Sequence, residues 1–350
     1  MRKPAAWLFS AGLLLLVGLL VSQGLTPVFA TLARAGWGLL LVALFHLLPL
    51  WLDAEAIRVL FDAGATGGAW RDALLARWVG ESANSLMPLG QVAGPVVMTR
   101  HLSRRGMATQ GAAAAITVST TLQALAQFAF ALLGVALLAL PARLETARLA
   151  TAGARQEHHA VLIGTLTASI VLALILVSFY LVQRRGLFGG AVRWLARVAH
   201  RREWSALMSR AEAIDAAVED TYRRGRAAAA SFALSLAGWL VGSGEVYLAL
   251  WLLGSPVGWR DALLLESLGQ AIRGAAFAIP GALGVQEGGY LLLAPFAGLT
   301  PDAALALSFA KRAREILLGV PGLIYLHHCE RAWRRAQSAV ADPDSGRAFL

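Results

Sequence analysis

The six-residue sequence Trp-Arg-Asp-Ala-Leu-Leu occurs twice in this chain, at Trp70–Leu75 and again at Trp259–Leu264. Each copy opens a hydrophobic stretch that proline and glycine interrupt further along the chain. Both stretches contain Leu-Gly-x-x-x-Gly, at Leu89–Gly94 and at Leu283–Gly288. Paired, interrupted hydrophobic segments at matching positions of two halves are the best sequence indication of a binding site in a membrane transporter. The repeat therefore predicts where each half begins to build such a site.

The composition is that of a membrane protein. The chain has 350 residues, of which 57% are hydrophobic and 15% charged, and its mean hydropathy is +0.61. A soluble protein has about 25% charged residues. The net charge of +10 would favour nucleic-acid binding only on a soluble basic face. Here the arginines cluster in short segments between apolar runs, which is typical of membrane orientation signals. The single cysteine, Cys329, excludes an internal disulfide.

Apolar runs of about 20 residues are long enough to cross a bilayer as a helix. The sequence predicts an all-α integral membrane protein with six spanning helices and two interrupted segments. The predicted spans lie near residues 5–23, 36–60, 111–140, 160–182, 227–253 and 303–326. The interrupted segments lie at about 73–98 and 262–297, so each precedes the last span of its half.

The distribution of arginine predicts the topology. Arg2 and Lys3 precede the first span, so the positive-inside rule places the N-terminus in the cytoplasm. The loops that are then cytoplasmic carry most of the arginines, ten of them between Arg184 and Arg226. This bias holds only if each interrupted segment returns to the side from which it enters. We therefore interpret both as re-entrant pairs of half-helices; the alternative is that both cross the membrane and another boundary is misplaced.

Two halves of opposite orientation follow from this topology. The first membrane half is 1–140, an outer loop covers 141–158, the second half is 159–328, and 329–350 is a cytoplasmic tail. Chance recurrence of six residues in an Ala-, Leu- and Arg-rich chain is the alternative, but the shared position within each half favours an inverted repeat. The basic cytoplasmic loop 184–226 is predicted either as an interfacial helix or as a solvated connector.

The interruptions are candidate binding regions. Irregular backbone survives in hydrocarbon only where it is buried in protein or lines a wet cavity, so we expect residues 85–95 and 279–289 at such a cavity. Proline ends helices, and glycine lets the backbone approach a ligand closely. A half-helix N-terminus would offer N–H groups to an anion such as a lipid phosphate. The candidate substrate-binding residues here are Asn84, Pro88, Gly90, Gly94, Pro280, Gly281, Gly284 and Glu287.

Charged residues at membrane depth are costly, and they face a cavity or pair with one another. The cations expected to hold a polar or anionic headgroup are Arg273, Lys311, Arg312 and Arg314. The acids expected to balance charge or to carry a coupled proton are Glu81, Glu245 and Glu315, with Glu287 as a further candidate. Because Arg273, Arg312 and Arg314 outnumber the acids near them, the sequence predicts a cationic cavity that attracts phosphate; for any one charge, an internal salt bridge is an equal alternative. His46, alone on an apolar helix, is interpreted as a packed core residue.

The sequence does not predict an enzyme. It has no Walker loop, no Gly-x-Ser-x-Gly, no His-Glu-x-x-His and no Asp-rich diphosphate motif. Adjacent residues such as His327, His328 and Cys329 cannot all face one ion from a helix. We therefore expect no catalytic residues, no metal site and no cofactor.

The residues that surround the interruptions resemble a known family. The run Asn84-Ser-Leu-Met-Pro-Leu-Gly-Gln-Val-Ala-Gly94, followed by the basic stretch 100–106, is similar to the transmembrane domain family of lysylphosphatidylglycerol synthases. Residues 279–289 and 310–322 look like its hopanoid-biosynthesis-associated branch, and the resemblance covers essentially the whole chain. The chain departs from the family at Ala93-Gly94-Pro95, where many relatives have paired glycines.

The resemblance implies a multi-pass protein of the bacterial inner membrane that moves lipids between leaflets. In the synthases an aminoacyl transferase domain follows; this chain ends soon after the last predicted span, so lipid aminoacylation is not expected. The expected partners are membrane lipids, with hopanoid-pathway proteins as further candidates and no nucleic acid. A hopanoid cargo without phosphate would offer no anionic group for these arginines to bind. The alternatives are a proton-driven transporter of a small solute and a scaffold that recruits lipid-biosynthetic enzymes through loop 184–226.

Overall fold

The structure is a computed structural model that describes residues 30, 33, 35–61, 70–87, 93–138, 205–276 and 279–341. All regular elements within these ranges are helices, which confirms the predicted all-α class. The predicted spans at 5–23 and 160–182 lie outside the described residues, as do residues 184–204 of the basic loop.

Three described helical segments are long and apolar enough to cross a membrane. They are α3 (Gly38–Phe45) continued by α4 (Leu47–Arg58), α7 (Thr109–Leu138) and α12 (Gly225–Leu252). They coincide with the spans predicted at 36–60, 111–140 and 227–253. The last predicted span lies inside α15 (Pro301–Ala341), a continuous 41-residue helix that is less apolar because charged residues interrupt this span at 311–315. A total of six spans stays a prediction.

Each copy of the repeated hexapeptide begins a helix of 17 residues, α5 (Trp70–Leu86) and α13 (Trp259–Ala275). The aspartate of each copy, Asp72 or Asp261, lies in the first turn. A carboxylate is favourable there because it faces the positive end of the helix dipole. In α13 this carboxylate also accepts a hydrogen bond from the Gly258 N–H, at 3.2 Å. The same short sequence thus begins both helices, and in each the aspartate stabilises the first turn.

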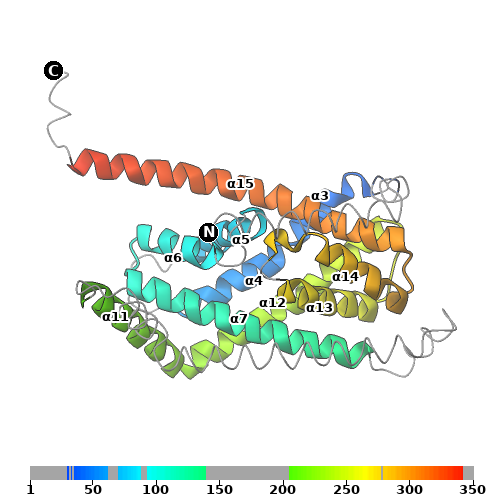
Figure 1. Cartoon of the computed structure of the whole chain (residues 1–350), viewed down its shortest axis with the longest axis horizontal. Coiled ribbons are helices and arrows are strands. Elements are labelled where there is room, and N and C mark those ends of the chain that lie inside the picture. The colour runs from blue at the N-terminus through cyan, green and yellow to red at the C-terminus, as the bar shows by residue number, and fades with distance from the viewer. Residues whose placement is uncertain are drawn as a thin grey trace, which may run out of the picture.

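After its 17-residue helix, each half continues with a shorter helix and then a long one. The shorter helices are α6 (Ala93–Arg104) and α14 (Val285–Leu293), and the long ones are α7 and α15. The long helices are exchanged between the halves: α7 packs on α13, and α15 packs on α5. In Figure 1, α7 and α15 lie along opposite sides of the molecule, and their chains run in opposite directions.

A glycine facing a serine allows close approach in both exchanged pairs. A Cβ added to Gly322 of α15 would lie 2.1 Å from Ser82 Oγ of α5, and one added to Gly134 of α7 would lie 2.1 Å from Ser267 Oγ of α13. Both serine hydroxyls donate to the carbonyl four residues earlier on their own helix. Small residues at a helix contact are the usual way in which membrane helices pack tightly.

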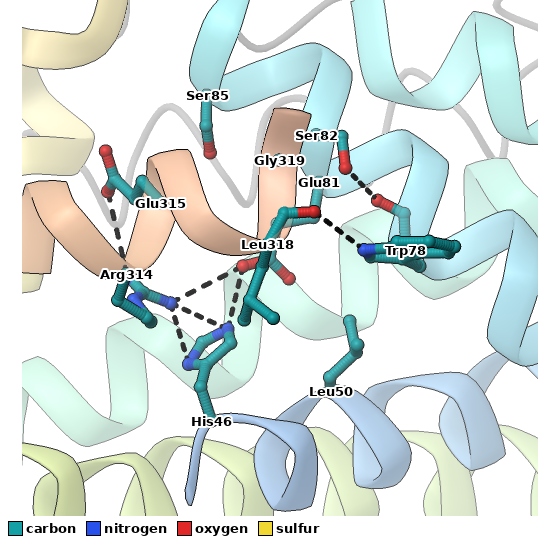
Figure 2. Close-up of a pocket in the computed structure, with 10 residues that line it drawn as sticks. All are labelled: His46, Leu50, Trp78, Glu81, Ser82, Ser85, Arg314, Glu315, Leu318 and Gly319. Atoms are coloured by element: carbon teal, nitrogen blue, oxygen red, sulfur yellow. Dashed lines mark hydrogen bonds and ion pairs between the residues drawn. The ribbon is translucent and has the colours of Figure 1, made fainter. Parts of the chain in front are cut away.

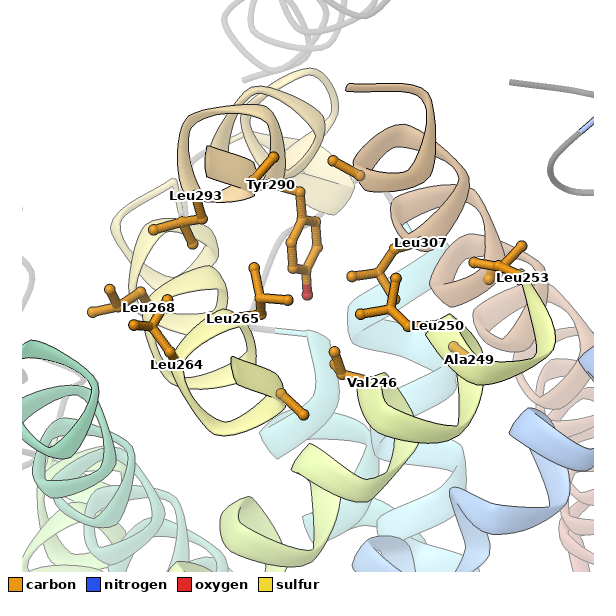
Figure 3. Packing of buried hydrophobic residues seen from close by; sticks show 14 of the residues in the cluster. Val246, Ala249, Leu250, Leu253, Leu264, Leu265, Leu268, Tyr290, Leu293 and Leu307 are labelled. Atoms are coloured by element: carbon orange, nitrogen blue, oxygen red, sulfur yellow. The ribbon is translucent and has the colours of Figure 1, made fainter. Parts of the chain in front are cut away.

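Two apolar clusters make up the core. In the first, which we call the Tyr290 cluster, the ring of Tyr290 lies among Leu250 of α12, Leu265 of α13 and Leu307 of α15 (Figure 3). The second, the Leu102 cluster, joins α4, α5, α6 and α7. On α7, residues 112–122 belong to the Leu102 cluster and residues 135–138 to the Tyr290 cluster. Polar side chains of α7 lie between them, so the two clusters enclose a polar layer.

The second interrupted segment is a broken helix, as predicted. After α13 ends, a 3₁₀ turn, η2 (Pro280–Ala282), leads into α14. Gly281 (φ 62°), Ala282 (φ 49°) and Gly284 (φ 76°) have left-handed backbone, which favours glycine because it has no Cβ. Pro280 begins the 3₁₀ turn rather than ending α13. The η3 turn (Ala294–Ala297) then completes this predicted segment.

The first interruption is shorter than predicted. Residues 85–95 were expected to be irregular, but Ser85 is still in α5, and Gly94 and Pro95 are in the first turn of α6. Proline is tolerated there because the first N–H groups of a helix have no partner within it. Pro88 and Gly90 lie outside the described residues.

The described part of the basic loop is helical and packs on the bundle. Helix α11 (Ser205–Arg223) contacts α7, and its Val218 is buried in the Leu102 cluster. Arg224 then donates to the carbonyls of Leu60 (2.7 Å) and Phe61 (3.1 Å) at the end of the α4 segment. A fully solvated connector is therefore excluded for residues 205–224, whereas contact with a leaflet stays a prediction.

Candidate functional site

Among the residues that the structure describes, twelve ionisable side chains gather in the polar layer, and we call them the charge cluster. Its carboxylates are Asp53, Glu81, Glu245, Glu266, Glu287 and Glu315. Its permanent cations are Arg77, Arg273, Lys311, Arg312 and Arg314, and His46 is the twelfth member. They come from both halves, on α4, α5, α12, α13, α14 and α15 and at the α3–α4 junction. The structure thus brings together all the charged residues that the sequence predicted for the site.

The predicted excess of cations is not found among the residues that the structure describes. The charge cluster holds six carboxylates against five permanent cations. The balance differs from the expectation because Asp53 of α4 and Glu266 of α13 add two acids to the layer, whereas Arg77 adds one cation. Asp53 is not among the residues predicted from the sequence, although an acid within an apolar span was a usable signal.

Lys311 is the most deeply buried cation of the cluster. Its residue is 1% exposed, and its Nζ lies 2.5 Å from Glu266 Oε2 and 4.0 Å from Glu245 Oε1. Glu266 also accepts a hydrogen bond from Gln270 at 2.8 Å. Lys311 thereby ties α15 to α13 and α12, and a buried charge requires such pairing.

Glu287 and Arg312 hold the turn between α13 and α14. Glu287 Oε2 accepts the Gly284 N–H at 2.8 Å and so caps α14. Arg312 donates from Nη1 to the Gly281 carbonyl at 2.5 Å and pairs through Nε with Glu287 Oε1 at 3.1 Å. Ser308 Oγ donates to the same carboxylate oxygen at 3.0 Å. In this conformation both residues satisfy backbone groups that a broken helix leaves without partners.

Arg273 is held between two acceptors. Its Nη1 donates to Gln286 Oε1 at 3.1 Å and forms an ion pair with Glu315. Glu315 also lies 3.5 Å from Arg312 Nη1 and 3.6 Å from Arg314 Nη2. One carboxylate therefore links three of the four cations that were predicted to hold a headgroup.

The two broken segments meet at the end of α5. In the first segment, Asn84 Oδ1 accepts the Gly94 N–H at 2.7 Å, as Glu287 accepts a glycine N–H in the second. A Cβ built on Gly281 would lie 3.8 Å from the Ser85 carbonyl oxygen, so η2 contacts α5. The end of α5 and the η2 turn therefore lie side by side, whereas a cavity lined by both interruptions stays a prediction.

A second group of ion pairs joins the first half together. Arg77 Nη2 lies 2.6 Å from Asp53 Oδ2 and 3.9 Å from Glu81 Oε2. Gln123 of α7 donates to the same aspartate oxygen at 2.8 Å and accepts from Arg77 Nη1 at 3.2 Å. Helices α4, α5 and α7 are thus linked at the depth of the charge cluster.

His46 lies between α3 and α4 at the centre of the cluster, and its interpretation as a packed core residue is wrong. Its Nε2 is 2.8 Å from Glu81 Oε1, and its Nδ1 is 2.7 Å from Glu245 Oε2. Arg314 Nη1 lies 2.7 Å from both ring nitrogens. The carboxylates are 35 and 199 residues away in sequence, so no local pattern reveals them.

A small pocket lies beside His46, between α4, α5 and α15 (Figure 2). It is lined by His46, Leu50, Trp78, Glu81, Ser82, Ser85, Arg314, Glu315, Leu318 and Gly319. Its cavity volume of about 10 Å³ is about the room that one water molecule needs. A phosphate headgroup does not fit, so the pocket is closed in this conformation. Trp78 Nε1 donates to the Leu318 carbonyl at 2.9 Å and ties α5 to α15 beside it.

The fold and the charge cluster define a membrane-embedded, multi-pass helical protein with a buried polar layer. The family described as the lysylphosphatidylglycerol synthase TM region matches residues 6–322. The chain therefore belongs to this family of membrane proteins involved in lipid handling. No curated protein and no solved structure matches the chain.

Proposed function

We propose that the protein is a lipid translocase, which moves a polar-headed lipid between the leaflets of the bacterial inner membrane without modifying it. The charge cluster, placed where the two broken segments meet, is the observation that carries this proposal. A charged residue at the centre of a membrane helix costs about 3 kcal/mol even on insertion scales. Buried ion pairs seldom repay that cost. A layer of twelve such groups is therefore better explained by a polar cargo than by stability alone.

The two halves are proposed to form an inverted repeat with both termini in the cytoplasm. Three features support this arrangement: the two helices of equal length that the hexapeptide begins, the exchanged long helices and the glycine–serine contact in each exchanged pair. In transporters with inverted repeats, one half rocks against the other around a site at their interface. The charge cluster occupies such an interface.

The pocket between α5 and α15 is the proposed headgroup site. Of the four predicted cations, Arg314 lines this pocket, whereas Lys311, Arg273 and Arg312 are engaged in pairs that hold α13 and α14. The site is closed, so α5 and α15 must separate before a headgroup enters. Beyond the pocket, α15 exposes the apolar side chains Ile316, Leu317, Val320 and Ile324. Acyl chains that stay in the bilayer would lie along this face.

The proposed cargo carries a phosphate. A phosphate pairs with the guanidinium of Arg314 in the geometry that arginine favours. A hopanoid without phosphate would leave Arg314 without a ligand. If the cargo is a hopanoid, we therefore expect a derivative that carries a phosphate or another anionic group. Membrane lipids are the proposed partners.

The test is reconstitution into liposomes that contain headgroup-labelled phospholipids or hopanoids. We expect wild-type protein to translocate at least one labelled lipid, and Arg314→Gln to lower the rate at least tenfold. Arg314→Lys keeps the charge but not the planar fork, and an intermediate rate is expected. Arg260→Gln, on the exposed first turn of α13, is the matched control and keeps the wild-type rate. Folding of each variant is checked by its elution profile and thermal unfolding. Absence of protein-dependent translocation for every lipid would refute the proposal.

A further inference from the structure

His46 is the one member of the charge cluster whose ordinary titration falls near physiological pH. With its carboxylates ionised, the cluster has six negative and five permanently positive groups. A neutral His46 leaves it with one uncompensated negative charge, whereas an imidazolium makes it neutral. Buried charge that is not compensated is expensive in a medium of low dielectric constant. Protonation of His46 therefore lowers the electrostatic cost of adding one more anion to the layer.

His46 has two sets of partners that exclude each other. Only an imidazolium can donate from both ring nitrogens, and carboxylate oxygens of Glu81 and Glu245 lie at hydrogen-bond distance from the two nitrogens. Arg314 Nη1, 2.7 Å from both nitrogens, can donate only to a nitrogen with a lone pair, which the neutral ring alone provides. Protonation thus strengthens the carboxylate contacts and breaks the contact with Arg314.

The charged surroundings of His46 come from each helix that packs around it. They are Asp53 on its own segment, Arg77 and Glu81 on α5, Glu245 on α12, and Lys311, Arg314 and Glu315 on α15. His46 therefore touches groups of both halves, and it lies at the break between α3 and α4. A change in its partners acts on the interface between the halves rather than inside one of them.

We propose that His46 is a proton-binding site that couples a proton to the binding of an anionic phosphodiester headgroup in the adjacent pocket. The proton converts the imidazole into an imidazolium, which holds Glu81 and Glu245. Arg314 is then released from the ring and from these carboxylates, and its guanidinium pairs with the phosphate. One proton and one monoanionic headgroup together leave the charge of the buried layer unchanged. This inference rests on the proposed translocase function and adds its coupling ion and substrate class.

The coupling is measured by isothermal titration of full-length protein in detergent with short-chain phosphatidylglycerol. Titrations above pH 7, in buffers of different ionisation enthalpy, give the number of protons taken up for each lipid bound. We expect uptake approaching one proton for wild type, and an affinity that falls up to about tenfold per pH unit as the pH rises. His46→Gln, which keeps a donor and an acceptor, is expected to take up none. His328→Gln, an exposed histidine on α15, is the matched control and behaves as wild type.

Dimethyl phosphate is a monoanionic phosphodiester without lipid tails. It therefore distinguishes binding of a lipid headgroup from binding of a small soluble phosphodiester. If it binds as tightly as the lipid, with the same proton uptake, the coupled ligand is a small soluble anion and the lipid assignment is overturned. Lipid binding by wild type without proton uptake overturns the coupling, and this measurement needs no variant. Undiminished uptake by a folded His46→Gln overturns the assignment to His46. The proposed function survives if lipid binds without proton uptake, or if His46→Gln takes up protons as wild type does, provided that liposome translocation persists. If no lipid is bound or moved, the proposed function itself fails.

Discussion

Arg312 of α15 and Glu287 of α14 form a partly buried ion pair, with 3.1 Å between Nε and Oε1, that closes the turn between α13 and α14. The carboxylate accepts the Gly284 N–H, and the guanidinium donates to the Gly281 carbonyl. The pair therefore satisfies both a donor and an acceptor of the broken backbone. In a membrane such backbone groups cost several kcal/mol when they have no partner. The broken backbone between α13 and α14 is therefore stable only with this ion pair in place.

Glu287→Gln is expected to destabilise the protein by about 3 kcal/mol, because it leaves the largely buried guanidinium of Arg312 with only the more distant Glu315 carboxylate, at 3.5 Å. The measurement is thermal unfolding in detergent followed by intrinsic fluorescence. Glu219→Gln removes an exposed i,i+4 pair with Arg223 on α11 and is the control, with an expected change within about 0.5 kcal/mol. Equal unfolding of both variants would contradict the structural role of Glu287.

The left-handed backbone of the second break predicts opposite effects at neighbouring positions. Gly284→Ala places a Cβ on a residue with φ 76° and is expected to cost about 1–2 kcal/mol. Ala282→Gly removes a Cβ from φ 49°, so it is expected to be neutral or to stabilise by up to about 1 kcal/mol. Thermal unfolding distinguishes them, and the prediction fails if Ala282→Gly is the more destabilising change.

A disulfide between α5 and α15 is expected to stop translocation, because the proposed pocket opens between these helices. A Cβ built on Gly322 lies 3.0 Å from Ser82 Cβ, somewhat shorter than the roughly 3.8 Å of a disulfide. The double variant Ser82→Cys/Gly322→Cys, with Cys329→Ala as background, is oxidised and assayed in liposomes. We expect at least tenfold loss on oxidation and recovery on reduction. The single-cysteine variants should not respond to the oxidant, and full activity of the oxidised double variant would exclude opening at this contact.

His101 of α6, outside the three candidate spans, predicts a loss of stability in acid. It is 0% exposed, and its ring contacts Tyr325 and Trp333. Burial, with Arg105 as the next cause, lowers its pKa from 6.5 to about 4. The unfolded chain therefore binds this proton more readily than the folded one, so stability declines as the pH falls from about 6.5 toward 4, by up to about 3 kcal/mol.

His101→Phe is expected to reduce that acid-dependent loss while it keeps the aromatic packing. Neither ring nitrogen of His101 has a hydrogen-bond partner within the described part of the chain, so phenylalanine breaks no such bond. The comparison is the difference in unfolding temperature between pH 7.5 and pH 4.5 for wild type and variant. The same acid-dependent loss in both proteins would show that another group is responsible.

What the sequence alone determined is local. Apolar runs predicted the all-α class, and the repeated hexapeptide with its proline and glycine interruptions predicted two matching segments, because such patterns are set by neighbouring residues. The Pro280–Gly284 break was visible for the same reason, since proline and glycine change the backbone where they stand. The predicted charges did converge on one layer, because charge is costly wherever a chain crosses hydrocarbon.

Only the tertiary structure decided which charges meet and what they do. It placed His46 between Glu81 and Glu245, brought Asp53 to Arg77, and turned an expected excess of cations into a slight excess of acids. It also closed the pocket to about the volume of one water molecule. These outcomes depend on how α4, α5, α12 and α15 pack against one another. Ion-pair energy depends on distances between atoms far apart in sequence, and no local pattern encodes those distances.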